Sequence, residues 1–490
     1  MGTNGSEHPA SERLTTGVGG LDEVLNGGLR PRSATLVRGA PGSGKTILGL
    51  HFLASGVEAG ETGLYVNLGE PSAYIRDTAR AFGLDIDPVE FLTLSPSGEE
   101  FQTETTYDLF SSAEVEGPSL VDEIREEVEA IDPDRVVVDP ATEFRYLTTD
   151  EHQFRTQILS LLDFLKAEGA TVLLTSQAAQ SMPDDELQFL VDAVLNVAEG
   201  ADRRTVSVSK FRGSAARTGQ HTLAITEEGM SVWPRLDPGR FRVDGPRTTL
   251  SSGIPELDQL LSGGLTTGTV TLFSGPTGVG KTTTALQFLQ EAADRGQRSV
   301  LYSFEENTRT LLDRAEAVNI PVAELIERGT LRVEELGTEG LTVDEFTSRV
   351  RTEVEERDAE VIAIDGTTGF EQSLVGFDGA PMEHLVDIGQ YLRNANVTGL
   401  ITNEVHQITG SFQATEQRIS HLADSIVILR HVEYKGKLRK VIGVLKMRTS
   451  DYEPRLRELE ITEKGLHVGE PLTDLRGILT GTPEWDDATD

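Results

Sequence analysis

Residues 271–289 read TLFSGPTGVGKTTTALQFL, and this stretch decides the fold. A short apolar run, Val270 to Phe273, leads into a glycine-rich turn that ends in Gly-Lys-Thr, and apolar residues with helical spacing follow. This order of strand, turn and helix is the GxxxxGK[ST] pattern of a phosphate-binding loop. The turn directs backbone N–H groups, and the positive end of the new helix, at one phosphate group.

The loop predicts ATP and Mg²⁺ as cofactors. We expect the ammonium of Lys281 to reach the β- and γ-phosphates and the hydroxyl of Thr282 to hold Mg²⁺. The remaining nucleotide-binding positions of this loop are Gly275, Thr277, Gly278, Val279 and Gly280.

A second copy of the loop lies upstream. It contains the nucleotide-binding candidates Gly39, Gly42, Ser43, Gly44, Lys45 and Thr46, with Thr46 as the magnesium candidate. The flanking sequence is duplicated as well, since LTTGVGGLDEVLNGGL at 14–29 matches LSSGIPELDQLLSGGL at 250–265. The offsets 253 − 17, 258 − 22 and 281 − 45 all equal 236, and Lys-Phe-Arg at 210–212 matches Lys-Met-Arg at 446–448 with the same offset.

This duplication predicts two large domains. We place them at residues 13–232 and 248–483, with a flexible start at 1–12, a proline- and glycine-rich linker at 233–247 and an acidic tail at 484–490. In the first domain we expect strands near 34–38, 63–68, 135–138, 171–175 and 193–197, and helices near 45–58, 72–82, 119–130 and 152–168. Alternating strands and helices predict an α/β fold in each domain, a mostly parallel twisted sheet with ligands beyond the carboxyl ends of its strands. The segments after 203 and after 438 are expected to add antiparallel hairpins.

The composition restricts the partners and the surroundings. The net charge is −36 and the acidic residues are spread along the chain, which argues against binding to nucleic-acid backbones. Such charge favours a salt-rich cytoplasm, because about 1 M salt shortens the Debye length to about 3 Å. There is no cysteine and no long apolar run, so we expect a cytoplasmic protein without disulfides or a membrane segment.

Two aspartates are candidate magnesium residues. Asp139 and Asp365 each end a valine- or isoleucine-rich strand downstream of a phosphate-binding loop. In that position an aspartate holds Mg²⁺ through its water shell.

The strand that follows each loop carries the most informative difference between the halves. The later half has Glu305-Glu306 at its end, whereas the same offset places Gly69-Glu70 in the earlier half. A carboxylate at this point can orient and deprotonate the attacking nucleophile. The catalytic candidates are therefore Glu305, Glu306 and Lys281 in the later half, and Lys45 and Glu70 in the earlier half. We expect the earlier site to bind ATP but to hydrolyse it poorly, unless Glu70 substitutes for the missing glutamate.

From Leu14 to Pro483 the chain resembles the KaiC family of RecA-type ATPases. The resemblance rests on the doubled start of each half, the Phe-Glu-Glu strand end and the Lys-x-Arg elements. It implies two stacked RecA-like domains, hexameric rings and ATP bound between neighbouring subunits. It also implies nucleotide contacts from Lys210, Arg212, Lys440, Lys446, Met447 and Arg448.

The same resemblance implies autophosphorylation of a Ser-Thr pair in the second domain. Ser420 matches the serine, but His421 stands at the threonine position. Only Glu484 to Asp490 follow Pro483, so the long tail that engages the family's activator protein is not expected here.

Two other functions stay open at this point. A DNA-directed motor of the RecA superfamily would show ATP turnover that is stimulated by DNA and falls steeply with salt. A nucleotide-switched scaffold would assemble with ATP and would not hydrolyse it. The leading interpretation is an ATPase in signalling or timing, with possible serine/threonine autokinase activity.

Overall fold

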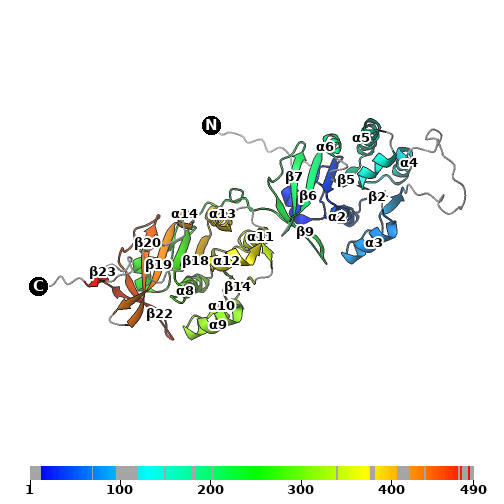
Figure 1. The fold of residues 1–490 in the computed structure, drawn as a ribbon. Helices are drawn as coiled ribbons and strands as arrows, with labels where there is room; N and C mark the ends of the chain where they lie inside the picture. Colours follow the sequence, from blue (N-terminus) through cyan, green and yellow to red (C-terminus); the bar gives the residue numbers. More distant parts are fainter. Residues whose placement is uncertain are drawn as a thin grey trace, which may run out of the picture. The chain divides into compact units, whose positions relative to one another are not determined.

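The computed structural model describes residues 13–68, 70–94, 120–147, 150–177, 184–200, 203–337, 340–375, 381–405, 419–434, 437–472, 475–476 and 484–485. The chain divides between Arg235 and Leu236 into two compact units (Figure 1). Each unit contains one large sheet, and the two sheets have the same strand order.

The sheet of the first unit is parallel on one side and antiparallel on the other. Its order is β3 (Glu90–Thr93), β2 (Gly63–Asn67), β4 (Arg135–Asp139), β5 (Thr171–Gln177), β1 (Ala34–Gly39), β6 (Ala193–Glu199), β7 (Arg204–Phe211), β8 (His221–Thr226) and β9 (Gly229–Trp233). In this order, the six neighbouring strands from β3 to β6 pair in parallel, and the last four, from β6 to β9, form antiparallel pairs.

Helices cover both faces of this sheet, which explains why its central strands β1, β2, β4 and β5 are almost entirely buried. One face packs against α1 (Gly19–Val24), α2 (Lys45–Glu58) and α3 (Ser72–Ala81). The other packs against α4 (Leu120–Ile131), the 3-10 helix η2 (Ala141–Leu147), α5 (Glu151–Ala167) and α6 (Asp185–Leu190).

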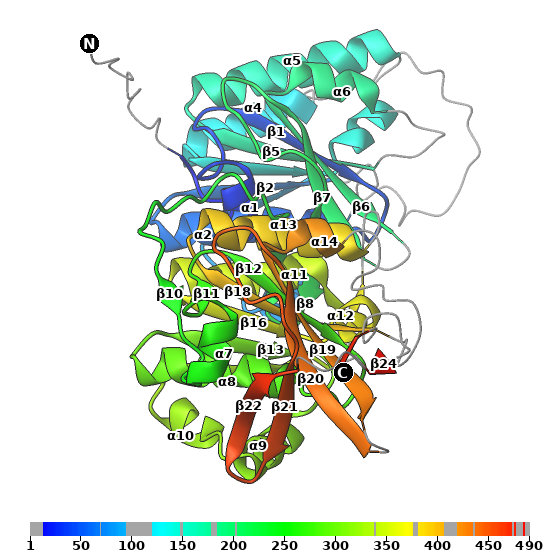
Figure 2. The ribbon, with the colours of Figure 1, turned by 90° about the vertical axis from the view of Figure 1, so that its left-hand side faces the viewer.

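The second unit repeats this arrangement. Its sheet has the order β14 (Leu331–Glu335), β13 (Ser299–Ser303), β16 (Val361–Asp365), β18 (Thr398–Glu404), β12 (Val270–Gly275), β19 (Ser425–Tyr434), β20 (Lys437–Met447), β21 (Arg457–Thr462) and β22 (Gly465–Pro471). Figure 2 shows the hairpin of β21 and β22 at the end of this sheet.

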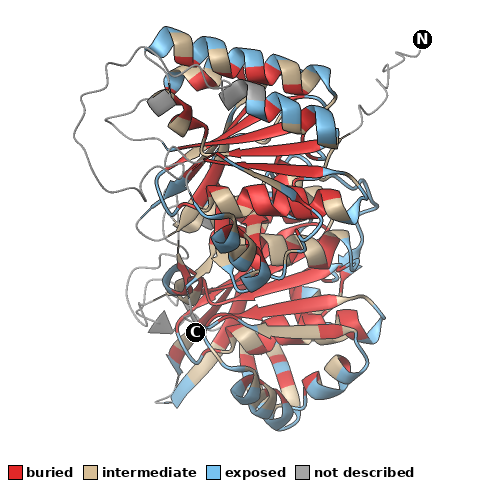
Figure 3. Ribbon diagram, turned by 90° about the vertical axis from the view of Figure 1, so that its right-hand side faces the viewer, coloured by how far each residue is buried: buried red, intermediate tan, exposed pale blue. Residues whose placement is uncertain are grey.

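The central strand β12 shows how the sequence builds the two layers. Leu272 faces the cluster formed with α11 (Val343–Glu355), α12 (Thr367–Ser373), α13 (Pro381–Asn394) and α14 (Ile419–Leu422). Phe273 faces the cluster formed with α7 (Pro255–Leu260), α8 (Lys281–Asp294), α9 (Thr308–Ala317) and α10 (Val322–Glu327). Successive side chains point to opposite faces of a strand, so an uninterrupted apolar run fits a strand buried on both sides. Figure 3 shows the strands of both sheets largely buried.

These observations confirm the expected fold class, two tandem α/β units with mostly parallel sheets. The antiparallel strands after 203 and after 438 are also present. The short strand β3, the short helices α1 and α6, and η2 were not predicted, because four to seven residues carry too little periodicity to identify.

The last glycine of each phosphate-binding loop is fixed by backbone conformation and by the hairpin behind it. Gly44 and Gly280 have φ of +105° and +111°, in the region that side chains disfavour. A Cβ on Gly280 would lie 2.4 Å from Cδ1 of Ile461 in β21, and one on Gly44 would lie 2.7 Å from Cδ1 of Ile225 in β8. The antiparallel hairpin therefore supports the loop from behind in both units.

We expect Gly280→Ala to lower the stability of the second unit, because the strained φ alone costs about 1–3 kcal/mol and the new methyl group also displaces Ile461. Gly278→Ala is the matched control, since Gly278 has φ of +71° but nothing within 4 Å of a Cβ. Thermal unfolding of the nucleotide-free proteins should show the larger loss for Gly280→Ala. Equal losses would mean that contact with the hairpin contributes nothing.

Candidate functional site

Both phosphate-binding loops lie at the carboxyl end of the central strand of their sheet, where each turn leads into a helix. Lys281 and Lys45 are the first residues of α8 and α2, and both side chains are buried. The ammonium of Lys281 donates to the Pro276 carbonyl at 3.0 Å, and that of Lys45 donates to the Gly39 and Ala40 carbonyls at 3.0 and 2.8 Å. Each lysine is therefore folded back over its own loop, where a phosphate would lie.

The lysines differ in the negative charge around them. Burial lowers the pKa of Lys281, and Glu305, Glu404 and Asp365 act in the opposite direction. Burial also lowers the pKa of Lys45, which Asp139 opposes. Sequence analysis missed Glu404. It ends β18, where it pairs with Gly275 of the loop, while Gln177 pairs with Gly39 in the first unit.

The threonine and the aspartate predicted to hold magnesium lie together in each unit. Thr282 donates to Oδ1 of Asp365 at 2.9 Å, and Thr46 donates to Oδ2 of Asp139 at 2.7 Å. This contact joins the start of the nucleotide-binding helix to a strand that lies, in the sheet, two strands away from the one that leads into the loop.

The second unit leaves an oxygen available for magnesium. Thr402 also donates to Oδ1 of Asp365, at 2.7 Å, whereas Oδ2 is buried and has no hydrogen-bond partner among the described residues. Burial raises the pKa of Asp365, and the bonds from Thr402 and Thr282 act against that rise. A buried carboxylate oxygen beside a threonine hydroxyl fits Mg²⁺ with its water shell. Within the described ranges no group of three or more acidic or histidine residues could hold a metal.

Glu305 is placed by the glycine after Asp365. A Cβ on Gly366 would lie 2.4 Å from Cγ of Glu305, so the glutamate side chain rests directly on that glycine. Partial burial raises the pKa of Glu305, and Asp365 raises it further, while Lys281 lowers it. A carboxylate with a raised pKa is suited to act as a general base.

Glu306 is engaged elsewhere. Its carboxylate accepts a hydrogen bond from Arg314 of α9, and its backbone is tied to the Ser303 hydroxyl. Because the arginine is bound to one oxygen of this carboxylate and so opposes its uptake of a proton, the geometry favours Glu305 over Glu306 as the base.

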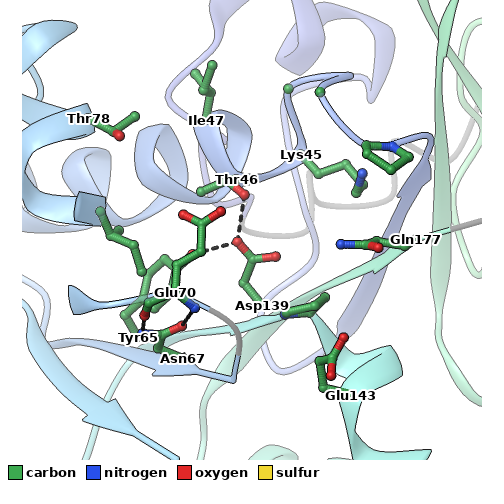
Figure 4. Close-up of a pocket in the computed structure, with 15 residues that line it drawn as sticks. Lys45, Thr46, Ile47, Tyr65, Asn67, Glu70, Thr78, Asp139, Glu143 and Gln177 are labelled. Carbon is green, nitrogen blue, oxygen red and sulfur yellow. Dashed lines mark hydrogen bonds between the residues drawn. The ribbon is translucent and has the colours of Figure 1, made fainter. Parts of the chain in front are cut away.

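The first unit contains a cavity of about 480 Å³ at the equivalent place. Figure 4 shows Lys45, Thr46, Tyr65, Glu70, Asp139 and Gln177 around it. Asn67 holds the backbone of Glu70 as Ser303 holds that of Glu306, but Thr78 stands where the second unit has Arg314 (314 − 78 = 236). Glu70 therefore lies in the pocket without the counterpart of that arginine.

At two neighbouring positions of the site, the units differ in which position carries the large residue and which the small one. In the second unit Glu305 lies on Gly366, which follows Asp365. In the first unit Pro140 follows Asp139 and lines the cavity, and residue 69 is a glycine that lies outside the described residues. A proline ring thus takes the position of the glycine that the glutamate needs.

The candidate residues contributed to a neighbouring subunit lie in or just after the first antiparallel strand of each sheet, β7 or β20. Lys446 donates to the Ala423 carbonyl at 2.6 Å, and Lys210 donates to the Val191 carbonyl at 2.6 Å, so both lysines contact their own unit. Arg212 and Arg448 are exposed.

The other nucleotide-contact candidates lie on the same strand of the second unit. Lys440 and Met447 both belong to β20, where Lys440 pairs with His431. Ser420 falls within α14, but its side chain lies outside the described part of the chain.

The fold and the site together define a P-loop ATPase with two tandem RecA-like units. The family described as "ATPase: KaiC" matches residues 14–237 and 250–473, and the chain belongs to this family. It is 28% identical to the circadian clock protein KaiC3 of Synechocystis sp., over 96% of this chain and 94% of the relative. It is also 28% identical to the circadian clock oscillator protein KaiC of Synechococcus elongatus (98% and 93%), and 29% identical to that of Thermostichus vulcanus (98% and 95%).

Among the helices that the structure describes, none combines the length and the apolar character needed to cross a membrane.

The raised pKa of Glu305 gives a test of its role. We expect the acidic limb of ATP turnover to lie above pH 4.5, because the base works only when it is deprotonated. Glu305→Gln should reduce turnover at least about 100-fold and remove this limb, and Glu306→Gln is the control. A pH–rate profile in high-salt buffer measures both effects, and an unchanged rate in Glu305→Gln would contradict the assignment.

The same shift predicts a change in stability. A carboxylate whose pKa is raised by folding stabilises the folded state when protonated, and this contribution is lost as pH rises through the folded pKa. We therefore expect Glu305→Gln to raise the melting temperature at pH 7, where the glutamate is charged, and to have a smaller effect near pH 4. Thermal unfolding at the two pH values checks the sign.

Proposed function

We propose that this protein is a magnesium-dependent ATPase of KaiC type in which the second domain performs most of the hydrolysis. The first domain binds ATP and turns it over weakly or not at all. The observation that carries the proposal is the exchange of Glu305 and Gly366 for Gly69 and Pro140.

In the proposed mechanism each group of the second site has one task. The glycine-rich loop and Lys281 bind the phosphates, Thr282 and Asp365 hold the magnesium ion, and Glu305 orients the attacking water and accepts its proton. The bound magnesium ion would neutralise charge on the phosphate oxygens. Gly366 lets the glutamate lie against the strand end, which fixes the position of its carboxylate.

The surroundings of the site favour assembly into a ring of copies of this chain. Arg212 and Arg448 are exposed just after β7 and β20, where a neighbouring copy could present a triphosphate to them. The relatives are named as circadian clock proteins, which supports a role in timing or signalling. The net charge of −36 supports a protein of the cytoplasm that works in high salt and does not bind DNA.

Autophosphorylation is a second candidate activity, supported by the position of Ser420 in a KaiC-type chain. In that reaction the serine hydroxyl attacks the γ-phosphate in place of water and Glu305 accepts its proton. The bond between the γ-phosphorus and the bridging oxygen breaks, and ADP leaves. Intact-mass analysis after incubation with Mg·ATP should show one added phosphate that is absent from Ser420→Ala. A protein of unchanged mass would exclude the activity.

The division of labour is tested by removing one lysine at a time. We expect Lys281→Ala to abolish nearly all ATP turnover, and Lys45→Ala to retain most of it, because only the second site has a positioned base. Phosphate release by the full-length variants measures the partition. Equal losses would show that the two sites hydrolyse ATP equally or depend on each other.

The size exchange suggests a rescue of the first site. In a Lys281→Ala background we expect Gly69→Glu alone to remain inactive, because Pro140 stands where Gly366 accommodates Glu305. Gly69→Glu combined with Pro140→Gly should give measurable turnover, and Pro140→Gly alone is the control. Activity in Gly69→Glu alone would show that the proline is no obstacle.

A further inference from the structure

Tyr65 distinguishes the first nucleotide site from the second. Its hydroxyl donates to Oδ2 of Asp139 at 2.6 Å, the same oxygen that accepts from Thr46 at 2.7 Å (Figure 4). Thr175 donates to Oδ1 of Asp139. The corresponding residue of the second unit is Leu301, since 301 − 65 = 236, and a leucine donates no hydrogen bond.

The aspartate of the second site consequently has a different set of hydrogen bonds. Both threonines of that site donate to Oδ1 of Asp365, and Oδ2 stays buried and without a partner among the described residues. A carboxylate oxygen has two lone-pair positions, so each aspartate has one oxygen that accepts two hydrogen bonds, Oδ2 of Asp139 and Oδ1 of Asp365. The other oxygen of Asp139 also accepts one bond, from Thr175, whereas Oδ2 of Asp365 accepts none from the described residues. With the bond from Tyr65, Asp139 has one acceptor position left and Asp365 has two.

The hydroxyl of Tyr65 is held in place. Its side chain is buried, and its ring stacks on Phe91 with centroids 5.2 Å apart and an angle of 12° between the planes. The guanidinium of Arg76 covers Phe91 at 4.2 Å. A tyrosine hydroxyl is protonated at neutral pH, so it donates to the carboxylate.

We infer that Tyr65 is a positioning residue that takes one acceptor position of the Asp139 carboxylate, on the oxygen that also binds Thr46, and makes nucleotide binding at the first site only weakly dependent on magnesium. This inference rests on the proposed function, in which the first site holds ATP. Asp139 can accept fewer hydrogen bonds from the water shell of a metal ion, because one acceptor position is taken by the phenol. At low Mg²⁺ concentration the first site would then still bind nucleotide, mainly through its loop and Lys45. The second site would need the metal ion to bind nucleotide.

The test uses the full-length chain with Lys281→Ala, so that nucleotide binding reports the first site. Tyr65→Phe removes the hydroxyl and keeps the stacked ring. Tyr302→Phe is the matched control, because Tyr302 is a buried tyrosine of the other unit whose hydroxyl has no hydrogen-bond partner among the described residues. Binding of a fluorescent ATP analogue is titrated with free Mg²⁺ from zero, in EDTA, to saturation. Binding of Mn²⁺ in the presence of nucleotide is followed by electron paramagnetic resonance.

We expect Tyr65→Phe to increase about tenfold the ratio of nucleotide affinity in saturating Mg²⁺ to that in EDTA, and to tighten Mn²⁺ binding similarly, the size typical of a change beside a metal ligand. Binding in EDTA should stay the same, and Tyr302→Phe should change neither quantity. The inference would be overturned by an unchanged or smaller affinity ratio in Tyr65→Phe, by an equal increase in Tyr302→Phe, or by loss of binding in EDTA. Each of these results would leave the proposed function standing. Failure of the Lys281→Ala parent to bind nucleotide at any Mg²⁺ concentration would instead overturn the proposed function of the first site.

Discussion

The hydrogen bond between Thr282 and Asp365, repeated between Thr46 and Asp139, is the contact on which the site depends. It joins the first turn of the nucleotide-binding helix to the carboxyl end of a strand two places away in the sheet. The bond can form only if β12, β18 and β16 lie in parallel and in the observed register. The hydrophobic layers on both faces fix that register, so packing of the core sets the geometry of the polar groups at its edge.

The two copies of this arrangement keep the same phosphate-binding and magnesium residues and differ in the residues around them. The loops, lysines, threonines and aspartates are kept, whereas the residues in contact with them differ. Glu404 becomes Gln177, Leu301 becomes Tyr65, and Arg314 becomes Thr78. Each replacement changes the charge or the hydrogen bonding around the phosphate site and leaves the strands undisturbed. The second site has more carboxylates near its lysine, and the first has an aspartate that accepts three hydrogen bonds instead of two.

The sequence predicted the fold well because its signals are local. The glycine-rich loop, the alternation of apolar strands with amphipathic helices and the constant offset of 236 are each read from neighbouring residues or from simple repetition. The contacts of Tyr65 with Asp139 and of Glu305 with Gly366 join residues about 60 or 70 positions apart, and they depend on strand pairing that no local pattern reveals. For the same reason the sequence proposed Glu306 and Glu305 together, since only the structure shows the arginine beside one of them.

The hairpin behind the loop gives the antiparallel edge a mechanical role. Ile461 of β21 lies against Gly280, and β21 pairs with β20, the strand that leads to Lys446 and Arg448. Backbone pairing of β20 with β21, and the contact of Ile461 with Gly280, thus connect the phosphate-binding loop to the strand that ends one residue before the exposed Arg448. A displacement of β21 would therefore act on Gly280 through a direct side-chain contact, and a change at the loop would act on β20 through the same two links.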